Sequence, residues 1–100
     1  LAGLMVLDLF AKSGIRVYYA GDLDPEGLLI AQKLSQYYKG EYNYWHMETA
    51  DYEKCRSEEM ISSKRMKILE RITDERLNPV VERIEEYGAA GYQEMLVEEM

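Results

Sequence analysis

Several residue types are scarce in this sequence, and each scarcity narrows the class of protein. The 100 residues include one cysteine, one histidine and two prolines. A single thiol, Cys55, cannot form a disulfide within the chain, so the reducing cytoplasm is the expected location. We interpret Cys55 as a half-buried small residue near a helix end rather than a nucleophile, because nothing in the sequence links it to His46.

Long hydrophobic runs and a signal peptide are also missing. The longest apolar clusters, residues 4–7 and 28–31, are far shorter than the roughly 20 residues that a membrane helix needs. We therefore expect no membrane partner. The chain begins at Leu1, inside what reads as an amphipathic helix over residues 1–12, so we expect one domain that is a C-terminal fragment of a longer protein.

Basic residues are fewer than acidic ones. The chain has 12 basic and 19 acidic residues, a net charge of −7, and most of the acidic excess falls in residues 51–100. An acidic chain does not attract phosphate backbones by itself. If the protein acts on DNA, its basic contacts are expected mainly elsewhere in the full-length protein.

The first half of the sequence predicts an α/β fold with parallel strands. The expected elements are the helix over 1–12, ended by Ser13-Gly14, a strand over 15–21, a helix from Pro25 that stops at Gly40, and a strand over 41–46. We expect the strand over 15–21 to be covered on both faces. The inward face of the second helix is predicted to carry Ile30, Ala31, Leu34, Tyr37 and Tyr38.

Residues 49–100 predict a helical extension of this core, with no further strand. The expected helices are Ala50–Arg56 capped by Thr49, Ser63–Ile72 with Met66, Leu69 and Ile72 inward, a helix capped by Asn78 that ends at Gly88, and a last one carrying Tyr92, Met95, Leu96 and Met100. The Ala89-Ala90-Gly91 stretch between the last two reads as a short joint. The predicted architecture is thus a partial, Rossmann-like parallel sheet over 1–48 with flanking helices and a helical half over 49–100.

The acidic turn, residues 21–27, carries the most chemical information. It lies where the first strand ends and the next helix begins, the edge at which open α/β sheets bind ligands. Asp22 and Asp24 are two residues apart, so in an extended segment their carboxylates point to the same side and Leu23 points to the other. Two carboxylates that face one way repel each other unless a cation lies between them.

Mg²⁺ fits this pattern, because it prefers oxygen ligands and often takes one or two carboxylates together with waters and phosphate oxygens. Glu26 is a further candidate ligand, and Gly21 and Gly27 leave room for a phosphate to approach the positive end of the helix. A purely structural reading stays open, in which Asp24 only caps the helix and Glu26 only complements its dipole. Capping does not explain Asp22, which ends an apolar strand.

The pattern of Asp22, Asp24, Pro25, Gly27 and Ile30 after a hydrophobic strand resembles the second acidic motif of Toprim domains, which occur in primases, topoisomerases and nucleases. The version with proline is most similar to the A subunit of type IIB topoisomerases. From the first helix to the terminal GYQEMLVEEM, the chain also resembles the C-terminal domain of the nuclease subunit of Wadjet plasmid-defence systems.

This resemblance implies magnesium-dependent (or manganese-dependent) DNA cleavage in plasmid or phage defence, with Asp22 and Asp24 as the catalytic metal ligands. It also implies DNA and defence-complex subunits as partners of the full-length protein. The general acid/base glutamate of such domains would precede residue 1, so the fragment alone is expected to be inactive. None of the nine tyrosines is nominated as a nucleophile.

Two other functions remain open. A phosphotransferase of the haloacid-dehalogenase type would use Asp22 as a nucleophile, but those enzymes usually continue with Gly-Thr where this chain has Pro25-Glu26. A protein-interaction domain, favoured by the acidic charge, would use the acidic turn only as a helix cap.

Other polar and aromatic groups follow the second strand. Glu48, Asp51 and His46 fall at the same sheet edge as the acidic turn, although solvated loop acids and a histidine that binds no ligand are the more ordinary readings. The aromatic residues of 37–45 read as core and rim rather than as a surface for stacking bases, because only Lys33 and Lys39 accompany them.

Overall fold

The computed structural model describes residues 9–92, and the elements follow one another as helix, strand, helix and strand before a mixed C-terminal half. Residues 9–12 are helical and a turn follows, in which Gly14 has a φ of +71°. Strand β1 (Val17–Tyr19) pairs in parallel with β2 (Tyr42–Tyr44), and helix α2 (Pro25–Tyr37) connects them. The predicted α/β fold with parallel strands is therefore confirmed.

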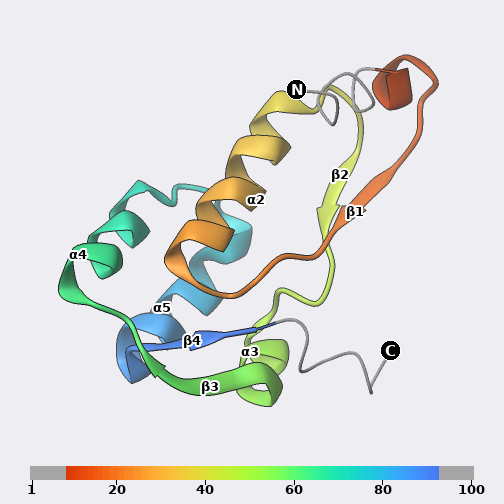
Figure 1. Ribbon diagram of the computed structural model, residues 1–100. Coiled ribbons are helices and arrows are strands. Elements are labelled where there is room, and N and C mark those ends of the chain that lie inside the picture. Colours follow the sequence, from red (N-terminus) through yellow and green to blue (C-terminus); the bar gives the residue numbers. More distant parts are fainter. Residues whose placement is uncertain (1–8, 93–100) are drawn as a thin grey trace.

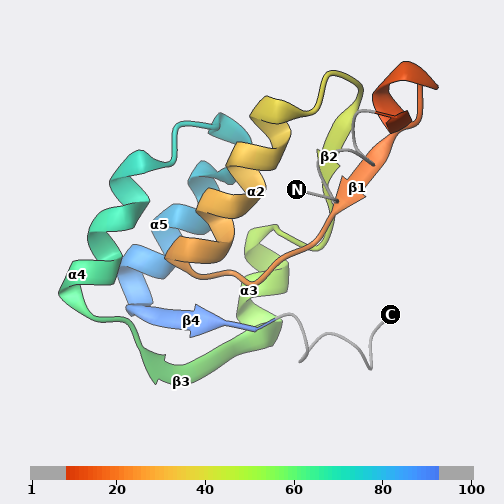
Figure 2. The ribbon, with the colours of Figure 1, turned by 45° about the horizontal axis from the view of Figure 1, so that its top comes forward.

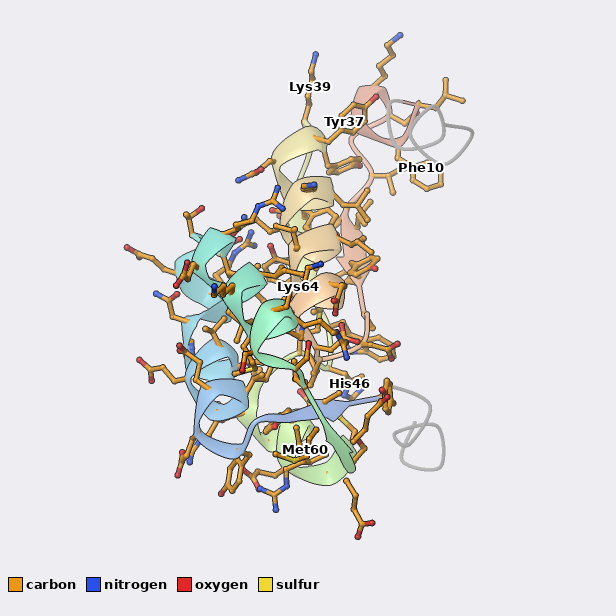
Figure 3. The ribbon with its side chains drawn as sticks, turned by 60° about the vertical axis from the view of Figure 1, so that its left-hand side comes forward. Phe10, Tyr37, Lys39, His46, Met60 and Lys64 are labelled. Atoms are coloured by element: carbon orange, nitrogen blue, oxygen red, sulfur yellow. The ribbon has the colours of Figure 1, made fainter. Side chains whose placement is uncertain are left out.

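Both strands are shorter than predicted, and β1 is not covered on both faces. Tyr18 points outward with 57% of its surface exposed. Helix α2 is rotated from the predicted orientation: Ala31 is fully buried, but Ile30 and Tyr37 are exposed. Figure 3 shows Tyr37 at the far end of α2 from the β3–β4 ribbon. The predicted inward face was wrong for these two residues, because α2 packs on the segment after α4 as well as on β2.

The C-terminal half is mostly helical, as predicted. It contains α3 (Thr49–Cys55), α4 (Ser63–Met66), the 3₁₀ turns η1 (Lys67–Arg71) and η2 (Glu75–Leu77), and α5 (Asn78–Tyr87). The predicted helix over 63–72 is thus split into α4 and η1, with Leu69 and Ile72 buried as expected. Glu48, not Thr49, caps α3, and Asn78 is the first residue of α5 rather than its cap. Gly88 ends α5 in the left-handed conformation, as predicted.

Two strands in this half were not predicted. Strand β3 (Arg56–Met60) pairs antiparallel with β4 (Ala89–Gly91), which is the stretch interpreted as a joint. Figures 1 and 2 place this ribbon at the lower end of the molecule, away from the β1–β2 pair. The expected last helix lies outside the described residues, except for Tyr92.

The main core lies among helices rather than between sheet layers. Its fully buried large side chains come from the acidic turn, α2, α3, η2 and α5, and include Leu23, Leu28, Tyr52, Leu77 and Ile84. Within residues 9–92, no helix combines the length and the apolar character that a membrane crossing requires.

Candidate metal site at the acidic turn

The acidic turn begins after β1 and is fixed at Leu23, the residue between its two aspartates. Leu23 is fully buried, its N–H donates to the carbonyl of Gly91 (2.7 Å), and its own carbonyl accepts from the Gly91 N–H (3.0 Å). Leu23 thus joins the β3–β4 ribbon by an isolated antiparallel bridge. Because neighbouring side chains alternate along extended backbone, burial of Leu23 leaves Asp22 exposed, whereas Asp24 is partly buried at the start of α2.

Asp24 caps helix α2, as the sequence predicted. Its backbone is extended (φ −137°, ψ 169°), and its Oδ1 accepts a 2.6 Å hydrogen bond from the N–H of Gly27. Pro25 then takes the first helical position, where its fixed φ suits the helix and its missing N–H costs nothing. One oxygen of Asp24 is therefore used by the fold, and the other, Oδ2, is not part of this cap.

Burial raises the pKa of Asp24, and the nearby carboxylates of Glu26 and Asp22 raise it further. The Gly27 hydrogen bond and Arg65 act in the opposite direction but do not cancel the effect. A raised pKa means that negative charge is disfavoured at this position, and a bound cation would relieve that cost. Asp22 is exposed, so it can meet a ligand from solvent without moving the core.

Glu26 is engaged by Arg65, a residue that sequence reasoning did not single out. The Nε of Arg65 donates to Oε2 of Glu26 (2.9 Å) and its Nη2 to Oε1 (2.8 Å), which lowers the pKa of Glu26. Arg65 belongs to α4, 39 residues further along the chain. No local spacing indicated this pair, because the contact depends on how α4 packs beside α2.

The two glycines of the turn make room for the chain itself. A Cβ at Gly27 would collide with the carbonyl oxygen of Asp22 and lie 2.8 Å from Oδ1 of Asp24. A Cβ at Gly21 would lie 2.8 Å from the ring of Tyr19. Gly27 therefore lets the turn fold tightly over the first turn of α2, which brings the carbonyl side of Asp22 against the helix start.

The polar groups after β2 contact one another. Oδ2 of Asp51 accepts from the N–H of Glu48 (2.9 Å), and its Oδ1 lies 3.1 Å from Nδ1 of His46. His46 has a φ of +55° and its ring packs 4.2 Å from that of Trp45. Asp51 is thus bound to its own helix start and to His46, and the structure gives it a local structural role.

The aromatic residues of 37–45 divide between core and rim, as predicted. Tyr38 and Tyr42 are buried, whereas Trp45 is 46% exposed. Two adjoining hollows of about 200 Å³ are both lined by Glu48 and Arg76, and Tyr44 lines one of them. Residues 21–27 line neither hollow.

Among residues 9–92, no three His, Cys, Asp or Glu side chains are grouped closely enough to form a metal cage. The fit to Mg²⁺ is that of a half-site: Asp22 and Oδ2 of Asp24 supply oxygen ligands, and waters or phosphate oxygens would fill the remaining positions. Glu26 would have to exchange its ion pair with Arg65 to join them.

The parallel strands, the tight acidic turn and the capped helix after it define an α/β domain with a strand–acidic turn–helix unit at the carboxyl end of β1. A family model described as "Protein of unknown function C-terminus (DUF2399)" matches residues 1–100. The chain belongs to this family. No curated protein and no solved structure matches it.

Proposed function

We propose that this chain supplies the aspartate pair of a Toprim-like, magnesium-dependent site that cleaves DNA, in a protein related to the nuclease subunit of Wadjet plasmid defence. The observation that supports the proposal best is the bridge between Leu23 and Gly91. It holds the residue between the two aspartates inward, while Asp22 is exposed and the side chain of Asp24 keeps 13% of its surface exposed at the start of α2.

In the proposed site, Asp22 and Asp24 hold the cation, and the cation stabilises negative charge on the oxygens of the scissile phosphate. Asp24 is kept in place by its hydrogen bond to Gly27, so one ligand is oriented before the cation arrives. The N-terminus of α2 adds a positive partial charge beside the bound phosphate.

Paramagnetic broadening by Mn²⁺ tests cation binding directly. We expect NMR signals of residues 21–27 to broaden first in the wild-type chain, and the effect to fall strongly in Asp22→Asn and Asp24→Asn. The matched control is Glu85→Gln, which removes an exposed carboxylate from α5. Equal broadening in wild type and both aspartate variants would remove the cation from the proposal.

DNA cleavage is tested in the full-length natural protein with supercoiled plasmid and Mg²⁺ or Mn²⁺. We expect nicking or linearisation by the wild type and loss of at least roughly a hundredfold in rate for Asp22→Ala, the order of effect that follows when one transition-state stabilising group is removed. Equal cleavage by both proteins would contradict the proposed role of Asp22.

The second candidate is a protein-interaction domain, and the ion pair of Glu26 with Arg65 favours it. Together with the Asp24 cap, this pair gives a structural use to Asp24 and Glu26. This reading predicts no Mn²⁺ response at millimolar concentration and unchanged partner binding in Asp22→Asn.

A further inference from the structure

Arg65 is placed beside the acidic turn by a contact that fixes its orientation. Both carboxylate oxygens of Glu26 accept from it, at 2.9 and 2.8 Å, in the planar two-bond geometry that arginine forms with carboxylates. Its side chain remains one-third exposed. A guanidinium has five N–H donors and Glu26 uses two, so the contact orients the group without exhausting its donors.

The same guanidinium lies next to Asp24 without a hydrogen bond to it. Nη2 of Arg65 is 3.7 Å from Oδ2 of Asp24, beyond hydrogen-bonding distance. Oδ2 is the oxygen that the helix cap does not use, and it forms an ion pair with Arg65 at this distance. A phosphate oxygen bound to a cation at Oδ2 would therefore lie within reach of Arg65.

We infer that Arg65 binds the DNA phosphate held by the cation, and that Glu26 positions Arg65 instead of binding the metal. This inference rests on the proposed function and adds a substrate contact to it. It also gives the acidic chain a basic group at the site. Arginine suits this role better than lysine would, because its planar guanidinium can donate to a phosphate with some of its N–H groups while others remain bound to the Glu26 carboxylate.

The surroundings of Arg65 predict that its contribution depends on the cation. Its guanidinium donates to both carboxylate oxygens of Glu26 and lies 3.7 Å from Oδ2 of Asp24. These two carboxylates oppose the attraction of one guanidinium for a phosphate. The cation must first neutralise the aspartates before Arg65 can act on a phosphate.

The test measures binding of a fluorescent duplex DNA to the full-length natural protein by anisotropy, in millimolar Mg²⁺ and in EDTA. We expect Arg65→Gln to weaken binding roughly tenfold in Mg²⁺ and to have no effect in EDTA, with the salt dependence reduced by about one phosphate contact. Arg65→Lys and Glu26→Gln should give intermediate losses. All three variants should keep the wild-type affinity for Mn²⁺.

The control is Arg83→Gln on α5, which removes an arginine that is exposed and paired with Glu86, and it should match the wild type. Thermal unfolding of each variant separates folding from binding, and Arg65→Lys carries the test if Arg65→Gln does not fold. DNA affinity of Arg65→Gln and Arg65→Lys equal to wild type in Mg²⁺ would overturn the inference.

Two further results separate this inference from the proposed function. Loss of Mn²⁺ affinity in Glu26→Gln as large as in Asp24→Asn would make Glu26 a ligand and overturn its positioning role. A wild-type protein that binds Mn²⁺ at the turn but shows no Mg²⁺-dependent DNA binding would overturn the role of Arg65 alone. Absence of Mn²⁺ binding in the wild type would remove both proposals.

Discussion

Asp24 has one observed role and one proposed role, and different substitutions can separate them. Its Oδ1 caps α2, and its Oδ2, which pairs with Arg65, is the oxygen proposed to bind a cation. Asp24→Ala should lower the free energy of unfolding by about 1 kcal/mol, the usual effect of losing a helix cap. Asp24→Asn keeps a capping oxygen and should unfold close to wild type, while its Mn²⁺ affinity falls. Urea unfolding and Mn²⁺ titration check the two parts, and an Asn variant that binds Mn²⁺ normally would contradict the second.

At the scale of residues, the sequence predicted the groups whose roles are local. Asp24 as a cap, Pro25 as the first helical residue and Gly88 as the helix end follow from rules about adjacent positions. Arg65 and Glu26 are separated by 39 residues, so their pairing depends on the packing of α4 and no periodicity could reveal it. The same holds for the contact of Leu23 with Gly91.

The loop between η1 and η2 is attached to α2 by one buried amide. Gln32 is 4% exposed, its Nε2 donates to the carbonyl of Arg71, and its Oε1 accepts from the N–H groups of Thr73 and Asp74. Gln32→Leu should cost about 2 kcal/mol, because these backbone groups lose their partners while part-buried. Gln36→Leu, at an exposed position of the same helix, is the control for urea unfolding. Equal stability of the two variants would contradict this role.

Asp74 links η2 to β2 and gives a prediction for pH. Burial alone would raise its pKa, but hydrogen bonds from Arg76 and Tyr44 hold the pKa below its usual value of 3.8. Folding therefore favours the charged form, so this stabilisation is complete above the unfolded pKa and is lost as the pH falls below 3.8 through the lowered folded pKa.

Asp74→Asn should accordingly be less stable than wild type near neutral pH. The difference in free energy of unfolding should shrink as the pH falls below 3.8. Urea titrations across this range measure it, and Glu85→Gln serves as the control. A difference that stays constant with pH would show that the carboxylate charge of Asp74 does not matter.

Among the elements, the helices were predictable and the C-terminal strands were not. Strand β3 reads RSEEM and is exposed at four of its five residues, so it has neither the apolar alternation nor the β-branched residues that indicate a strand. Strand β4 reads AAG and is buried, but small residues carry no strand signal. The two strands form because they pair with each other and because β4 also pairs with Leu23.

Across the whole molecule, β4 unites the two halves of the chain. Its Gly91 bonds to Leu23 on one side and packs against α3 on the other. A Cβ at Gly91 would lie 2.9 Å from Sγ of Cys55, so Gly91→Ala should cost about 1–3 kcal/mol as an overpacked core. Combining it with Cys55→Ala should recover part of that loss, because the smaller side chain leaves space. A double-mutant cycle by urea unfolding measures the coupling, and purely additive effects would contradict it.

The β3–β4 pair holds the acidic turn through the bridge between Gly91 and Leu23. The single cysteine, Cys55, can therefore report chemically on how often this contact opens. Cys55 is fully buried in contact with Gly91, and burial raises the pKa of its thiol to about 11. A maleimide reagent can reach it only when the ribbon separates from the core, so the rate of alkylation measures how often that separation occurs. If ligands of the turn draw its backbone together, they should slow this labelling without touching the sulfur.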